Sequence, residues 1–109
     1  MIPSGATAIV GAAESTEIGA VPNMSSVGLA IDAAANAMSD AGISASDIDG
    51  FTCGYFPVAD MSRQLGIFPT WADNTVVGGC SWFFQLRNAV AAINAGYCNT
   101  VLILSLIHI

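Results

Sequence analysis

Apolar residues recur at helical spacing in two segments of the chain, and each segment ends at a glycine. Such a glycine is typical of a helix that stops in a left-handed conformation. In the first segment, Ser25 or Ser26 can cap the helix and Gly42 ends it. Its apolar stripe consists of Ile31, Ala34, Met38 and Ala41.

The second helical segment is Ser81–Ala95, followed by Gly96. One stripe of this helix carries Phe83, Leu86, Val90 and Ile93. Its other faces are also apolar, with Arg87 as the only charge, so we expect a helix that is buried on all sides. If only these residues are present, the helix should be badly covered and the chain should self-associate.

Short apolar runs between these segments predict strands. Three runs have the composition of buried strands, and a fourth is a brief extended segment: Ala6–Ala12, Gly50–Gly54, Thr100–Leu106 and Trp71–Val77. A capping box formed by Ser44 and Asp47 predicts one helical turn, and Asp60 can cap a short helix through Leu65. This order predicts an α/β fold with a mostly parallel sheet and right-handed crossovers.

The composition suggests that something else covers part of this surface. The 109 residues are 54% hydrophobic and only 9% charged. A free-standing domain of this size normally exposes more charge. Missing chain or a partner subunit would provide the cover.

The charge pattern argues against nucleic acid as a partner. The net charge is −6, from eight acids and two arginines, and no basic patch is present. No secretory signal is apparent, which leaves the cytoplasm as the expected compartment. The apolar run 101–109 is too short for the roughly 20 residues of a membrane span.

Three cysteines, Cys53, Cys80 and Cys98, lack the spacing of a metal site and are expected to be free thiols. His108 is the only histidine, so no metal site is predicted. The segment 11–19 lacks both the glycine spacing and the lysine of a phosphate-binding loop, so no nucleotide cofactor is expected there.

The segment Val76–Gln85 (VVGGCSWFFQ) is the best candidate for chemistry. It places Cys80 between a strand and a helix N-terminus, where the backbone N–H groups favour a thiolate. Gly78 and Gly79 permit a tight turn and close approach of a substrate, and Ser81 completes the candidate substrate-binding set. A structural alternative is that Cys80 is simply a small apolar residue at a helix start.

Four segments resemble the thiolase superfamily, and specifically its lipid-transfer-protein or sterol-carrier-type branch. They are ATAIVGAAESTEIG, LAIDAAANAMSDAGISASDIDGF, RQLGI and VVGGCSWFFQLRNAVAAINAGYCNTVLI. The resemblance implies the N-terminal part of a thiolase-fold half, in an enzyme that transfers acyl groups or cleaves carbon–carbon bonds on a coenzyme A thioester. It also implies a homodimer, with coenzyme A entering as substrate and no bound cofactor.

The resemblance allows two alignments of this chain with the family around the nucleophile position, and they differ by one residue. Counting back from Gly96 without a gap places the family's acyl-accepting cysteine at Gly79, with Cys80 one residue later. Counting forward from Cys80 places Gln85 on a glutamine found in many thiolases, but this needs a deletion within the helix. In the first alignment, the chain resembles relatives without that cysteine, some of which are retro-aldolases that act with a small accessory protein.

The C-terminal residues depart from the family. The chain reads SLIHI where relatives continue into a turn, and this resembles translated sequencing-adapter DNA. We therefore expect a partial thiolase-like domain over residues 1–103 and a non-native tail over 104–109. Because the family's His and Cys acid–base residues come from a later half, the fragment alone should be inactive. The alternatives are a ketoacyl synthase, whose cysteine is normally followed by Ser-Gly, and a non-catalytic thiolase-like partner subunit.

Overall fold

The computed structural model describes residues 7–15, 25–54, 57–76 and 80–104. The elements in chain order are α1 (Ser26–Ala41), a 3-10 turn (Ala45–Asp47), β1 (Gly50–Cys53), α2 (Val58–Leu65), β2 (Trp71–Asn74), α3 (Ser81–Ala95) and β3 (Val101–Leu104). The strands form a parallel sheet in the order β2-β1-β3. The predicted α/β class and parallel sheet are confirmed.

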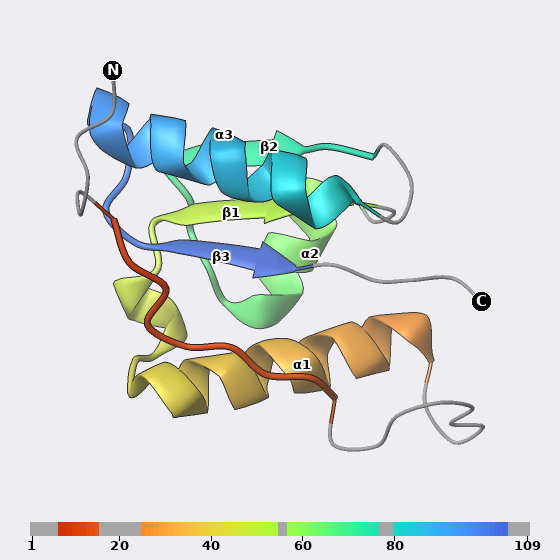
Figure 1. The fold of residues 1–109 in the computed structure, drawn as a ribbon. Coiled ribbons are helices and arrows are strands. Elements are labelled where there is room, and N and C mark those ends of the chain that lie inside the picture. The colour runs from red at the N-terminus through yellow and green to blue at the C-terminus, as the bar shows by residue number, and fades with distance from the viewer. Residues whose placement is uncertain (1–6, 16–24, 55–56, 77–79, 105–109) are drawn as a thin grey trace.

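Helices cover both faces of this sheet (Figure 1). α3 packs on one face, against all three strands, while α1 and α2 lie on the other. In the described residues, no helix is long and apolar enough to cross a membrane.

The apolar core lies between the sheet and the α1/α2 side. Its buried members come from both helices, from alternate strand positions and from the connections before β1 and after α2: Ala30, Ala34, Ile48, Phe51, Cys53, Met61, Ile67, Leu102 and Leu104. The predicted apolar residues Ile31 and Met38 of α1 pack against it. Because side chains alternate along a strand, the positions between these core residues face α3 instead.

The local signals at the ends of the helices are confirmed, except that Asp60 does not cap α2. Ser25 Oγ accepts a hydrogen bond from the backbone N–H of Gly28 at 3.0 Å, which caps α1. Ser44 and Asp47 form the predicted capping box. Gly42 and Gly96 end their helices with φ of 73° and 85°, and Gly66 does the same for α2. α2 itself begins at Val58, with Pro57 rather than Asp60 as its cap.

Asp49 joins the amino ends of β1 and β3. Its carboxylate accepts hydrogen bonds from the backbone N–H groups of Asn99, at 2.9 and 3.0 Å, and Thr100, at 2.8 Å. Its backbone oxygen accepts the N–H of Thr70 at 2.8 Å, just before β2. One residue therefore aligns the starts of all three strands.

The prediction of a strand over residues 6–12 is wrong, because the described part of this segment, residues 7–12, forms no strand. Ile9 and Val10 are 72% and 66% exposed. The segment is bonded to α1 instead of to a strand, because the N–H of Ala12 donates to Asp40 Oδ2 at 3.0 Å and Asn36 Nδ2 donates to the oxygen of Glu14 at 3.0 Å. A cavity of about 980 Å³ lies between this segment, α1, α3 and the free edge of β3.

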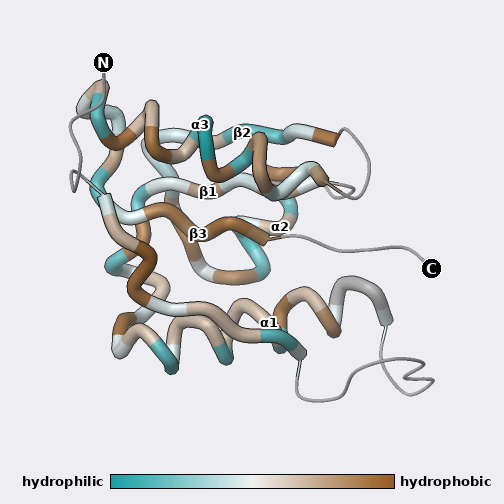
Figure 2. The backbone as a smooth tube through the Cα atoms, viewed as in Figure 1, coloured by the Kyte–Doolittle hydropathy of each residue, from teal (hydrophilic) through white to brown (hydrophobic). Residues whose placement is uncertain are grey.

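The other predicted strands are shorter in the structure. β1 ends at Cys53, β2 ends at Asn74, and β3 begins at Val101. The expected tail, 104–109, lies outside the described residues except for Leu104, which ends β3. Figure 2 shows β3 as an almost uniformly apolar strand, as its sequence predicts.

The bounds predicted for α3 are confirmed, and so is the prediction that the helix is badly covered when only these residues are present. Only four of its side chains are buried, and they share one face: Ser81, Gln85, Ala89 and Ala92. Phe83, from the apolar stripe named above, is 58% exposed, and Trp82 and Phe84 are 40% and 37% exposed. Small side chains face the sheet because they let the helix approach it closely, and the large apolar residues are left outward.

Candidate functional site

Cys80 lies where the carboxyl ends of the strands meet the start of α3. It is the N-cap residue of α3, and its backbone oxygen accepts the N–H of Phe83 at 3.1 Å. Figure 1 shows the start of α3 at the same edge as the arrowheads of the strands. In open parallel sheets this edge is where ligands normally bind.

The three cysteines differ in their accessibility. None forms a disulfide, as predicted, and Cys80 is exposed while Cys53 and Cys98 are buried. Burial, together with the negative charge of Asp73, raises the pKa of Cys53 from 9.0 to about 11. Burial, together with Asp49, also raises the pKa of Cys98. Cys80 is therefore the thiol that a substrate can reach.

The remaining predicted site residues divide into two groups. Ser81 is 3% exposed, so its side chain is packed within the fold. Gly78 and Gly79 lie outside the described residues, and so does His108. The described residues hold no group of three or more His, Cys, Asp or Glu side chains that could bind a metal ion.

A polar network that the sequence analysis missed links α3 to the end of β2. Asp73 Oδ2 accepts hydrogen bonds from Thr75 Oγ1 at 2.7 Å and Asn88 Nδ2 at 3.1 Å, with Thr52 Oγ1 at 3.5 Å. Gln85 Nε2 donates to the backbone oxygen of Thr75 at 3.1 Å. These bonds hold the first turns of α3 to the exit of β2, on either side of Cys80 in the sequence.

Gln85 is the unusual member of this network. Its side chain is 1% exposed, and its Oε1 is buried with no hydrogen-bond partner in the described structure. An unpaired buried polar atom of this kind costs about 1–3 kcal/mol. The only sequence signal for Gln85 is its place in the family pattern, and nothing local distinguishes Asp73, Thr75 or Asn88.

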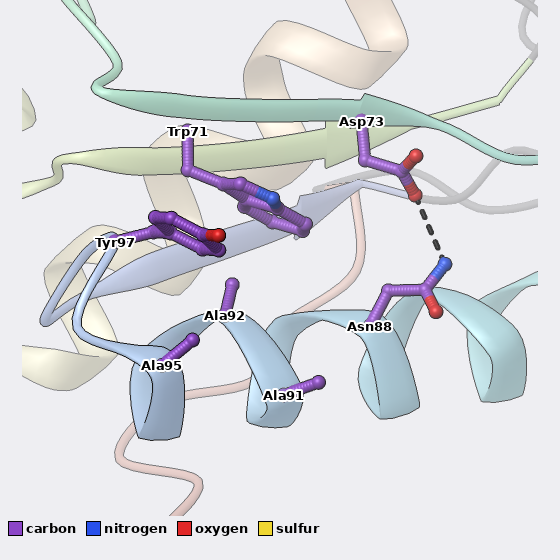
Figure 3. A pocket seen from close by; sticks show the side chains of 7 residues that line it. All are labelled: Trp71, Asp73, Asn88, Ala91, Ala92, Ala95 and Tyr97. Atoms are coloured by element: carbon purple, nitrogen blue, oxygen red, sulfur yellow. Dashed lines mark hydrogen bonds between the residues drawn. The ribbon is translucent and has the colours of Figure 1, made fainter.

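A depression of about 450 Å³ continues from this network between β2 and α3 (Figure 3). The Asp73–Asn88 hydrogen bond lies at one end of it. Trp71 and Tyr97 form an aromatic wall toward the other end, opposite the alanines of α3. The depression follows the second half of α3, so it extends away from Cys80.

No protein-family model and no curated protein sequence matches the chain. Solved structures do match it. The monomeric SCP2-thiolase-like protein type 1 of Mycobacterium smegmatis is 32% identical, with a TM-score of 0.72 over 89% of this chain and 22% of that one. The Ltp2-ChsH2(DUF35) aldolase is 25% identical, with a TM-score of 0.67 over 88% of this chain and 28% of that one.

A more distant match is OleA of Xanthomonas campestris with bound lauric acid and lauroyl-CoA. It is 16% identical, with a TM-score of 0.68 over 77% of this chain and 28% of that chain. At this identity the likeness concerns the fold alone. The chain thus spans about a quarter of the length of the solved structures that it resembles.

Proposed function

Since the chain belongs to the thiolase superfamily, we propose that the protein is an acyl-CoA enzyme whose substrate thioester binds beside Cys80. The observation that supports this most directly is the position of Cys80. Cys80 is exposed at the N-terminus of α3, at the carboxyl ends of parallel strands, while the other two cysteines are buried. A thiol at a helix N-terminus is well placed for nucleophilic attack.

The first step that we propose is transfer of the acyl group to Cys80. The Cys80 thiolate attacks the thioester carbonyl, a new carbon–sulfur bond forms, and the bond to the coenzyme A sulfur breaks. Coenzyme A leaves as a thiolate and takes up a proton. The N-terminus of α3 carries the positive end of the helix dipole, which favours negative charge developing nearby.

A second candidate, retro-aldol cleavage of a CoA thioester, is favoured by one observation. One similar solved structure is the Ltp2-ChsH2(DUF35) aldolase. In that case Cys80 is a neighbour of the substrate rather than its acyl acceptor, and a small accessory protein completes the enzyme.

Acylation of the protein separates these proposals. The protein is incubated with an acyl-CoA and the modified residue is located by mass spectrometry, with Cys80→Ser and the buried-site variant Cys53→Ser as a matched pair. We expect an acyl adduct on Cys80 that is lost only in Cys80→Ser. Retro-aldol turnover without an adduct supports the aldolase, and neither product nor adduct supports a non-catalytic subunit. An adduct that then condenses with a malonyl carrier supports a ketoacyl synthase.

We also propose that these 109 residues alone have no turnover and that the complete enzyme is a homodimer. In the described residues, no histidine stands beside Cys80 as a base, and three large apolar side chains at the start of α3 are exposed. Measurable thiolysis or retro-aldol cleavage by residues 1–109 would contradict the first proposal. Sedimentation of the complete protein as a monomer would contradict the second.

A further inference from the structure

The stability of the fold does not explain the glutamine at position 85. Its side chain is 1% exposed, and one of its polar atoms, Oε1, is buried with no partner in the described structure. An apolar side chain of the same length would avoid this unsatisfied oxygen. Exceptions of this kind tend to occur at functional sites.

The two residues that the Gln85 hydrogen bond joins lie on either side of Cys80 in the sequence. Gln85 Nε2 donates at 3.1 Å to the backbone oxygen of Thr75, ten residues earlier. The chain leaves β2 before Thr75 and enters α3 after Cys80. The bond therefore joins the two ends of the segment that carries this thiol.

The end of β1 is shaped to accommodate the same bond. A Cβ atom on Gly54 would lie 2.9 Å from the backbone oxygen of Thr75 and 3.4 Å from Gln85 Nε2. A side chain at Gly54 would thus push directly on the acceptor of the bond. The end of β1, the exit of β2 and the second turn of α3 all meet at this point.

We propose that Gln85 is a positioning residue, which fixes the Cys80 thiol relative to the carboxyl ends of the strands through its bond to Thr75. The inference rests on the proposed function in that Cys80 is taken to face the acyl-CoA site. The effect of Gln85 on the thiol can nevertheless be measured without any acyl-CoA.

The test is the rate at which iodoacetamide alkylates each cysteine of the native protein, followed by peptide mass spectrometry. Asn94→Leu is the control, because Asn94 is an exposed amide on the same helix that bonds only within it, to the oxygen of Val90 at 2.9 Å. In Gln85→Leu we expect the Cys80 rate to rise about three- to tenfold, the factor that corresponds to one lost hydrogen bond. Cys53 and Cys98 should stay protected, and Asn94→Leu should react like the wild type.

Gln85→Glu tests the hydrogen bond itself, because a protonated carboxyl can donate to the Thr75 oxygen and a carboxylate cannot. Burial raises the pKa of such a glutamate above its ordinary value of about 4.3. Below that raised pKa, the Cys80 rate should equal the wild-type rate measured at the same pH. Above it, the ratio of the two rates should rise toward that of Gln85→Leu. Gly54→Ala should accelerate Cys80 at every pH.

An unchanged or lower Cys80 rate in these variants would overturn the proposal. An equal rise in the alkylation rates of Cys53, Cys80 and Cys98 in all of them would also overturn it, since the bond would then hold the whole fold rather than one thiol. Failure of acyl-CoA to modify Cys80 would count against the proposed function and not against this inference.

Discussion

The two faces of the sheet differ in the side chains that pack against them. The face toward α1 and α2 is closed by large apolar side chains such as Phe51, Met61 and Ile67, all at most 2% exposed. The face toward α3 has small and polar contacts, and its largest apolar side chains point outward. The first face supplies stability, and the second carries the accessible thiol and the polar network.

The largest effect should come from the apolar face. Phe51→Ala removes a fully buried ring from the middle strand, which we expect to lower the free energy of unfolding by about 3–5 kcal/mol. Urea denaturation measures this loss. Phe68→Ala is the matched control, because Phe68 is 88% exposed and should change stability little. Equal losses in both variants would contradict the assignment of the core.

The next largest effect should come from Asp49, which aligns the strands for both faces. Asp49→Ala leaves the N–H groups of Asn99 and Thr100 without their carboxylate partner. We expect a loss of about 2 kcal/mol, as for hydrogen bonds to charged groups. Asp49→Asn keeps one acceptor oxygen and should lose less in the same urea titration. A larger loss of unfolding free energy in Asp49→Asn than in Asp49→Ala would contradict this role of Asp49.

A smaller effect, of about 1–2 kcal/mol, should appear as a pH dependence. The pKa of Cys53 is raised from 9.0 to about 11 in the folded protein. Above pH 9 the unfolded chain therefore releases the thiol proton while the folded protein retains it, so stability falls as the pH rises from 9 to 11. Urea denaturation over this range should show the decline, and Cys53→Ala should reduce it. An identical decline in the variant would refute the assignment.

The smallest effect on stability should come from the outward side of α3. Phe83 is 58% exposed, so Phe83→Ser should alter the free energy of unfolding by less than about 0.5 kcal/mol. It should, however, reduce self-association of the 109-residue chain in sedimentation velocity, because it removes exposed apolar area. Undiminished association would show that another surface is responsible.

The sequence predicted those features that depend on neighbouring residues. The glycine ends of α1 and α3, the capping box and the bounds of α3 follow from local backbone preferences. The α/β class followed from the order of the elements. The position of Cys80 at the start of α3 was predicted because its placement between a strand and a helix is also visible locally.

Features that depend on distant contacts were missed. The run 6–12 has the composition of a strand, but pairing is decided by other parts of the chain, and residues 7–12 bond to α1 instead. Because α3 is apolar nearly all round, its sequence did not indicate which side packs on the sheet, and small residues such as Ala89 and Ala92, not the large ones, face it. The network of Asp73, Thr75 and Asn88 joins residues up to 15 positions apart and has no sequence motif.

The most direct test of the central claim is protection of Cys80 by substrate. The rate of its alkylation by iodoacetamide in the complete protein is measured with increasing acyl-CoA, and Cys53 and Cys98 serve as internal references. An acyl-CoA site beside Cys80 predicts a saturable fall in the Cys80 rate, whether this residue accepts the acyl group or only lines the site. A Cys80 rate that stays constant up to millimolar acyl-CoA would contradict the account.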